Sequence, residues 1–192
     1  LTLAATDSFR LAEKTVFVGA EAPECQLIVP IKNITEVARA LEGVTGSLQL
    51  AYNANQISFT AGEIYLTSRL IEGVFPDYQK IIPTASQTQI VVLKNDLLKS
   101  LKLASVFADK FNQLTLKVLA SDKLLEISTH NSETGEITSQ LTAILSGEDL
   151  VISFNLRYML ECFPAVPSDS LELKFNGKQK PILITGVGDS SF

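Results

Sequence analysis

The chain repeats one structural pattern 123 residues apart, because Leu27 corresponds to Leu150 and Leu48 to Leu171. Each copy contains a short apolar run, a helix-like segment and two strand-like segments, over residues 26–62 and 149–186. An internal period of this length implies that two copies of one unit follow each other in series. The repeat therefore excludes most single-domain enzyme architectures before any side-chain chemistry is considered.

Composition sets the class of protein. A chain of 192 residues with 46% hydrophobic residues can form one large or two small cores. No stretch approaches 18 uninterrupted apolar residues, so we expect no membrane span. The first residues lack the basic and apolar regions of a signal peptide. They also lack Met and resemble the middle of a strand, so we do not expect a natural start here.

The net charge is −5. Such a charge argues against a protein that holds nucleic acid by bulk electrostatics, although it leaves room for one local basic face. The two cysteines, Cys25 and Cys162, occur without a CxxC or Cys/His spacing, which indicates free thiols in a reducing cytosol.

Strands predominate in the first part of the chain. Apolar residues at helical spacing, among them Ile34, Val37 and Leu41, predict one helix there. The expected strands are residues 1–5, 11–19, 26–31, 47–52, 56–61 and 64–71, with the helix at 32–41. We interpret residues 72–83 as a connector and 84–88 as a domain linker.

The second part of the chain contains the same strand and helix pattern twice. The expected strands are residues 89–93, 113–120, 124–129, 136–145, 150–154, 170–175 and 181–184. Two helices are expected, one that runs to about residue 108 with Asn95 or Asp96 as its N-cap, and one that starts near Leu156. The order is βαβββ followed by βαββ. The first part has the same order without an opening strand and helix, which is most simply explained if the chain is cut upstream.

Signals for catalysis are weak. His130 is the only histidine, and we expect it in an exposed loop. No nucleophile elbow, phosphate-binding loop, dinucleotide fingerprint or zinc-protease motif occurs. Acidic pairs such as Asp122 and Glu126 have no catalytic context. We therefore expect no catalytic residue, no metal and no cofactor.

Lysines gather on the polar faces of two expected helices. Lys94, Lys99 and Lys102 lie on one helix and Lys32 on another. Such faces are usually only solvated. Helices of repeated units tend to lie on one surface, however, and a few lysines there could contact phosphates although the molecule is acidic.

Two motifs carry a resemblance to a known family. The sequences ATDSFRLA at residues 5–12 and SRLIEGVFPDYQKIIP at 68–83 resemble the bacterial DNA polymerase III β subunit, the sliding clamp. FNLRY at 154–158 is a weaker match. The resemblance covers nearly the whole chain, as a second domain at 1–86 without its first strand and helix, and a third domain at 87–192 without its last strand.

The resemblance implies an α+β clamp fold of repeated βαβββ halves, with helices on the inner face and antiparallel sheets on the outer face. Family members are cytoplasmic, non-catalytic subunits of the holoenzyme that pair head to tail as a ring around duplex DNA. Weak phosphate contacts then suffice, which explains the negative net charge. The implied DNA-facing residues are Lys32, Lys99 and Lys102.

The resemblance also implies a pocket that receives short peptides from the replicative polymerase, the clamp loader, other polymerases and repair proteins. Apolar walls with few polar groups suit such an anchor site. The matching residues are Thr6, Ser8, Phe9, Arg10, Leu11, Pro76, Lys80, Ile81, Phe111, Asn155 and Tyr158.

The chain departs from the family in three ways. It stops before the tail that completes the pocket, it lacks the first domain, and Phe9 replaces the common histidine. Val106 and Phe107 are the residues expected to pack against that first domain in the dimer. We expect an incomplete pocket with weak peptide affinity and no closed ring.

Two other classes of function remain open from the residues alone. One is a β-rich interaction scaffold unrelated to DNA, and the other is an enzyme that uses loop carboxylates. Metal-dependent turnover that is abolished by one Asp or Glu substitution would favour the enzyme, whereas binding without dependence on DNA topology would favour the scaffold.

Overall fold

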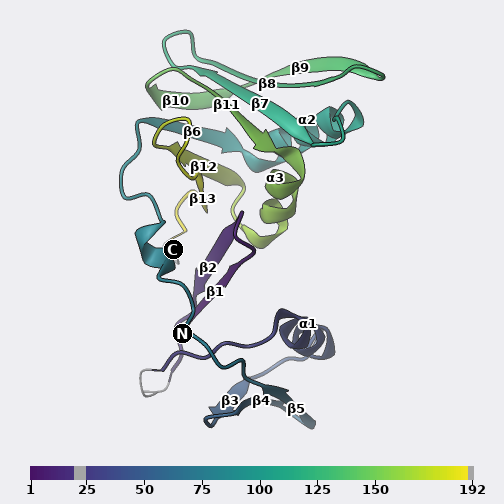
Figure 1. Cartoon of the computed structure of the whole chain (residues 1–192), viewed down its shortest axis with the longest axis vertical. Helices are drawn as coiled ribbons and strands as arrows, with labels where there is room; N and C mark the ends of the chain where they lie inside the picture. Colours follow the sequence, from purple (N-terminus) through teal and green to yellow (C-terminus); the bar gives the residue numbers. More distant parts are fainter. Residues whose placement is uncertain (20–24, 190–192) are drawn as a thin grey trace. The chain divides into compact units, whose positions relative to one another are not determined.

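The computed structural model describes residues 1–19 and 25–189. The chain divides into two compact units, of which unit 1 comprises Leu1–Val18 with Tyr78–Phe192 and unit 2 comprises Gly19–Asp77. Both units combine helices with antiparallel sheets, as expected for the α+β class (Figure 1). No helix among the described residues is long and apolar enough to cross a membrane.

Two four-stranded sheets form the body of unit 1, in the orders β10-β6-β12-β13 and β11-β7-β8-β9. Two α-helices and two short 3-10 helices complete it. Its elements are η1 (Tyr78–Lys80), β6 (Thr88–Leu93), α2 (Lys94–Val106), β7 (Gln113–Leu119), β8 (Leu124–Asn131), β9 (Gly135–Leu141), β10 (Ala143–Gly147), β11 (Leu150–Asn155), α3 (Leu156–Cys162), η2 (Phe163–Ala165), β12 (Ser170–Phe175) and β13 (Leu183–Gly186).

The two halves of this body exchange their first strands. β6 opens the first half but pairs with β12 of the second, with Ile90 opposite Leu173. β11 opens the second half but pairs with β7 of the first, with Ile152 opposite Leu116. Each sheet therefore contains strands from both halves, and the halves form one domain.

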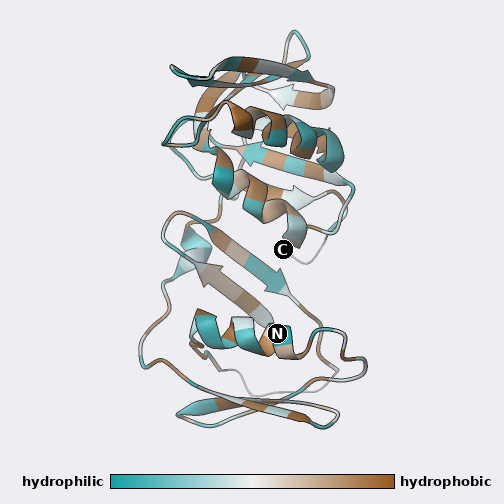
Figure 2. Cartoon of the chain, turned by 90° about the vertical axis from the view of Figure 1, so that its right-hand side faces the viewer, coloured by the Kyte–Doolittle hydropathy of each residue, from teal (hydrophilic) through white to brown (hydrophobic). Residues whose placement is uncertain are grey.

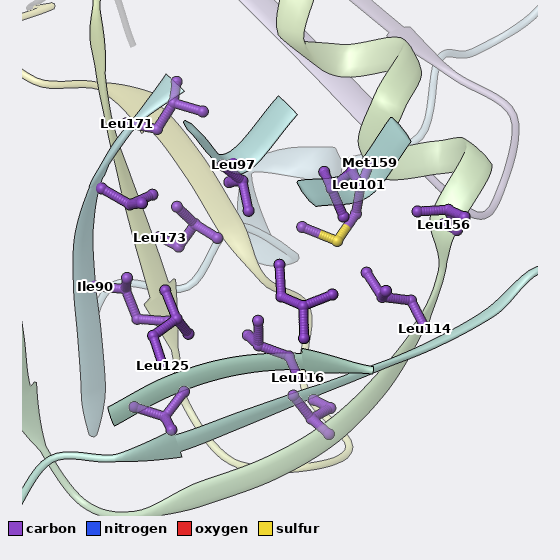
Figure 3. Close-up of a cluster of buried hydrophobic side chains, with 14 of the residues drawn as sticks. Ile90, Leu97, Leu101, Leu114, Leu116, Leu125, Leu156, Met159, Leu171 and Leu173 are labelled. Carbon is purple, nitrogen blue, oxygen red and sulfur yellow. The ribbon is translucent and has the colours of Figure 1, made fainter. Parts of the chain in front are cut away.

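One apolar core fills the space between the sheets and the helices. Its side chains are almost wholly buried, and those of α2 and α3 point toward those of the strands (Figure 3). In both helices apolar and polar residues alternate along the ribbon, as they do in amphipathic helices (Figure 2). The core includes Leu97, Leu101, Leu116, Leu156, Met159, Phe163, Leu173 and Phe175.

A two-stranded hairpin, β1 (Thr2–Thr6) and β2 (Leu11–Thr15), also belongs to unit 1. Thr6 lies opposite Leu11 at the end of the ladder, next to the turn. Unit 2 consists of α1 (Ile31–Ala40) and the sheet β3-β4-β5, formed by β3 (Gln49–Tyr52), β4 (Gln56–Ala61) and β5 (Ile64–Arg69). Its buried core is small and consists of Val37, Ile57 and Phe59.

The strand expected at residues 26–31 is absent. Residues 25–30 have no regular structure, and α1 begins at Ile31. The Ile28 carbonyl accepts a hydrogen bond from the Ile71 amide at 2.8 Å, and the Pro30 carbonyl accepts from the first turn of α1. The equivalent β11 is a strand because β7 supplies its ladder, whereas in the described part of the chain no strand pairs with residues 25–30.

Three smaller expectations in unit 1 were wrong. The single strand expected at 136–145 is two strands, because β9 pairs with β8 whereas β10 crosses to pair with β6. α2 begins at Lys94, so neither Asn95 nor Asp96 caps it, and Leu93 at its N-cap makes no side-chain bond. His130 is exposed as expected but lies in β8 rather than in a loop, opposite Glu136.

Candidate functional site

The turn between β1 and β2 is fixed by its own side chains. Asp7 Oδ1 accepts hydrogen bonds from the amides of Phe9 (3.0 Å) and Arg10 (2.8 Å). Thr6 Oγ1 donates to the Arg10 carbonyl at 2.7 Å and accepts from the Ser8 amide at 3.2 Å. Ser8 has a φ of 74°, which a tight turn of this kind requires. The turn therefore holds Phe9 outward, with 78% of its surface exposed.

Arg10 joins this turn to helix α3. Its Nε and Nη2 donate to Asp7 Oδ2 at 3.1 and 3.0 Å, and its Nη1 donates to Glu161 Oε2 at 2.6 Å. The other Glu161 oxygen, Oε1, accepts from Arg157 Nε at 2.8 Å. Two carboxylates thus hold one guanidinium between the hairpin and α3.

The network keeps its charges at neutral pH. Hydrogen bonds from the backbone amides of Arg10 and Phe9 are the main reason that the pKa of Asp7 is lowered. The guanidinium of Arg157 and then that of Arg10 lower the pKa of Glu161. Glu161 and then Asp7 raise the pKa of Arg10.

Tyr158 of α3 provides an aromatic surface beside this network. The Arg10 guanidinium carbon lies 4.6 Å from the centroid of the Tyr158 ring, a cation–π distance. The Phe9 ring lies 6.0 Å from the same ring at an interplanar angle of 33°. Two aromatic rings and a stacked guanidinium therefore form one partly exposed patch at the tip of the hairpin.

Asn155 sets the position of Tyr158. As the N-cap of α3, its Oδ1 accepts from the amides of Arg157 (3.0 Å) and Tyr158 (3.4 Å). Its Nδ2 donates to the Phe111 carbonyl at 3.3 Å. Phe111 is 68% exposed, and the ammonium of Lys110 lies 5.1 Å from its ring. A second exposed aromatic group is thus tied to the start of the same helix.

The structure brings most of the expected pocket residues into unit 1. The hairpin contains Thr6, Ser8, Phe9, Arg10 and Leu11. Asn155 and Tyr158 lie at the start of α3, and Phe111, which precedes β7, accepts a hydrogen bond from Asn155. Lys80 ends η1, and Ile81 follows it with 56% exposure. η1 is linked to β2, since a hydrogen bond with Glu13 is the main cause of the raised pKa of Tyr78. Pro76 belongs to unit 2.

Asp7, Arg157 and Glu161 were not among the expected site residues. The spacing of Arg157 and Glu161 on a helix could have predicted their ion pair. The contact of Glu161 with Arg10, 151 residues away, leaves no such local signal.

The expected DNA-facing and dimer residues are on helices. Lys32 lies in α1 of unit 2, and Lys99 and Lys102 lie in α2 of unit 1. Lys99 is exposed, and its Nζ lies 3.9 Å from Asp96 Oδ1. A groove of about 320 Å³ between α2 and α3 is lined by Lys94, Leu98, Lys102, Leu160, Phe163 and Pro164. Val106 ends α2 with 66% exposure, and Phe107 follows it half-buried.

Within residues 1–19 and 25–189, no group of three His, Cys, Asp or Glu side chains could hold a metal ion.

Two family models match the chain. The model described as "DNA polymerase III beta subunit, central domain" matches residues 1–77, and that described as "DNA polymerase III beta subunit, C-terminal domain" matches residues 79–192. The matches are consecutive and cover both units.

Named relatives and solved structures agree with these matches. The beta sliding clamp of Staphylococcus epidermidis is 28% identical over 192 residues, which are 100% of this chain and 51% of the relative. The DNA polymerase sliding clamp of Bacillus subtilis is 28% identical with a TM-score of 0.93, over 98% of this chain and 50% of that one. The DNA polymerase III beta subunit of Thermotoga maritima is 25% identical with a TM-score of 0.91, over 99% of this chain and 52% of that one. The chain spans about half the length of the curated relatives that it matches.

Proposed function

The chain belongs to the DNA polymerase III beta subunit family, and we propose that it supplies the central and C-terminal domains of a sliding clamp. Such a clamp encircles duplex DNA and tethers the replicative polymerase, which thereby becomes processive. The observation that carries the proposal is the pair of consecutive family matches over residues 1–77 and 79–192. The boundary expected between residues 86 and 87 stays a prediction.

The DNA is held by topology, with contacts to phosphates that do not depend on sequence. Exposed lysines on the helices, Lys32, Lys99 and Lys102, are the groups we assign to these contacts. The net charge of −5 supports holding by topology rather than by many phosphate contacts. Each phosphate neutralised by a cation makes binding stronger and more sensitive to salt, so a surface with few lysines permits sliding.

The role is non-catalytic and cytoplasmic, and it requires a ring. We assign Val106 and Phe107, at the C-terminal end of α2, to the head-to-tail interface of the homodimer. Val106 is 66% exposed, so its side chain is available to a partner surface.

The patch formed by Phe9, Arg10 and Tyr158 is the site that we assign to partner peptides. Its exposed aromatic rings and its few, fixed polar groups are the chemistry that anchors short apolar segments. The partners are the replicative polymerase, the clamp loader, other polymerases and repair proteins. We assign further residues to the same peptide site: Leu11, Lys80, Ile81, Phe111 and Asn155. Pro76 is assigned to the site from the family motif alone.

The topological test decides between a clamp and a scaffold. Protein containing this chain is loaded on nicked circular duplex DNA with its clamp loader and isolated with the DNA by gel filtration. We expect the protein to be released when the circle is cut once, because a ring slides off free ends. Retention that is equal on circular and linear DNA would contradict the proposal and favour a scaffold.

A peptide titration tests the candidate site separately. We expect a labelled clamp-binding peptide to bind these 192 residues more weakly than micromolar, and Tyr158→Ala to weaken that binding further. Glu133→Gln, in the turn between β8 and β9, is the matched control and is expected to leave binding unchanged. Micromolar or tighter binding to the 192-residue chain would contradict the expected weakness.

A further inference from the structure

Arg10 is the one guanidinium that stacks on an aromatic ring of the proposed peptide site within the described residues. A free guanidinium at such a site would recognise a carboxylate in two-pronged geometry. Here three of its nitrogens already donate to carboxylates that belong to the chain itself, two bonds to Asp7 and one to Glu161. The group that would otherwise select an acidic ligand therefore already uses three of its five N–H donors within the chain.

The two carboxylates are held in different ways. Asp7 is part of the turn, where its Oδ1 accepts two backbone amides while Oδ2 receives Arg10. Glu161 is held only by side chains, those of Arg10 and Arg157. A change at Asp7 would remove the turn itself, whereas a change at Glu161 alters the charge beside Arg10 and leaves the turn bonds in place.

The charges at this end of the patch balance, since Arg10 and Arg157 face Asp7 and Glu161. The side chains of Arg10, Asp7 and Glu161 are each about two-fifths exposed, so a ligand that covers Phe9 and Tyr158 lies close to both acids. An incoming carboxylate would be repelled by both acids, and it would find only two of the five N–H donors of Arg10 unused, one on Nη1 and one on Nη2, each nitrogen already bonded to one of those acids.

We propose that Glu161 is a specificity-determining residue of the peptide site, which makes the site select segments with an uncharged side chain over Phe9 and Tyr158 and reject acidic ones. The inference rests on the proposed function, because it concerns the same site. Arg10 then serves as a neutralised, stacked surface for apolar side chains rather than as an anion receptor. Lys110, beside Phe111, is the neighbouring charge that could attract an acid at a different position.

The test is a double-mutant cycle between the protein and the ligand. The probes are two amidated peptides, Gly-Ser-Leu-Gln-Leu-Phe and Gly-Ser-Leu-Glu-Leu-Phe, which differ only in one charge. Their affinities for the wild-type chain and for Glu161→Gln are measured by NMR titration, which also reports weak binding. Glutamine keeps an acceptor for Arg10, so the hairpin contact is retained while the charge is lost.

We expect the wild-type chain to prefer the glutamine peptide. In Glu161→Gln, the affinity ratio of the glutamate peptide to the glutamine peptide should rise about two- to five-fold, the range expected of one exposed charge pair. The rise should shrink in high salt. Glu133→Gln, with the same change of net charge, should leave the ratio unchanged.

The outcomes separate the two claims. A merely structural role of Glu161 would change both affinities by the same factor, so an unchanged ratio would overturn the inference while the peptide site stands. An equal rise of the ratio in Glu133→Gln would overturn it as well, because the effect would then come from net charge alone. Absence of binding for both peptides would overturn the peptide site and the inference together.

Discussion

Equivalent side chains in the two copies of the repeat are buried to very different extents. Leu50 of β3 is 40% exposed, whereas its counterpart Leu173 of β12 is 1% exposed. Tyr52 and Phe175, at the next inward position, show the same contrast. β12 lies between β6 and β13, whereas β3 pairs only with β4 among the described residues. The same pattern of residues thus gives a core or a half-covered edge, depending on the neighbouring strand.

The helix of the second copy, α3, is also better capped and more deeply packed than the helix of the first copy, α1. Asn155 caps α3 with two hydrogen bonds to backbone amides, whereas Pro30 at the start of α1 makes no side-chain cap. α3 lies on a large core, while α1 contributes one buried residue, Val37, which is 9% exposed. Unit 1 is therefore expected to be the more stable of the two units, and four measurements can test this comparison.

The largest effect is expected from truncation of equivalent leucines. Leu173→Ala should lower the free energy of unfolding by about 2–5 kcal/mol, because it opens a cavity in a packed core. Leu50→Ala is the matched control and should cost less than about 1 kcal/mol, since its side chain is partly in solvent already. Urea unfolding followed by far-UV circular dichroism measures both. Equal losses would contradict the comparison.

The next effect concerns the helix caps. Asn155→Ala should lower the free energy of unfolding by about 1 kcal/mol, because two amides of α3 lose their acceptor. Lys32→Ala, at the equivalent position of the repeat, should cost little because Lys32 caps nothing in α1. Hydrogen exchange of the first-turn amides in each helix reports the difference. A rise in exchange rate on substitution that is as large in α1 as in α3 would show that the cap is not the cause.

A smaller effect is expected from acid. The lowered pKa values of Asp7 and Glu161 mean that both groups contribute stability above their ordinary pKa values of 3.8 and 4.5. That contribution should be lost as the pH falls through the lowered values, so the contact between the hairpin and α3 should weaken only at pH values below the ordinary pKa of each group. Carboxyl NMR titrations follow each group. Titration of Glu161 at its ordinary value would contradict the contact with Arg10 and Arg157.

The smallest effect is expected in the reactivity of the two cysteine thiols. Burial raises the pKa of Cys162 in unit 1 to about 11, whereas Cys25 is exposed. Since the thiolate is the reactive form, only about one Cys162 in a thousand is reactive at pH 8. Reaction with a chromogenic disulfide should therefore show one fast and one slow thiol. Two equal rates would show that the core of unit 1 is open near α3.

The sequence predicted well where the structure depends on local periodicity. Both copies of the repeat, the three helices and most strands follow from apolar spacing, and the family motifs at 5–12 and 68–83 indicated the correct family. It failed where a distant partner decides. Residues 26–31 have the composition of a strand but no ladder among the described residues, and residues 136–145 divide because β9 and β10 serve different sheets.

The contacts of the candidate site likewise fall into local ones, which the sequence can predict, and distant ones, which it cannot. Thr6 and Asn155 act on neighbouring residues, through turn and cap chemistry that a sequence motif can carry. The contact between Arg10 and Glu161 depends on how the hairpin meets α3, so that neither residue alone indicates it. The sequence therefore predicted residues of the hairpin and of α3 that lie together in the candidate site, but not the charge pairing between Arg10 and Glu161.

The exchange of β6 and β11 between the two sheets has a consequence for how the protein is made. β6 finds its partner β12 only after about 80 further residues have been synthesised, as the pairing of Leu93 with Ser170 shows. Contacts between such distant residues form slowly, because the intervening chain must first be closed into a loop. A chain emerging from the ribosome is therefore expected to carry an unpaired edge on β6 until β12 has left the tunnel, and neither half can complete its sheet before the other is present.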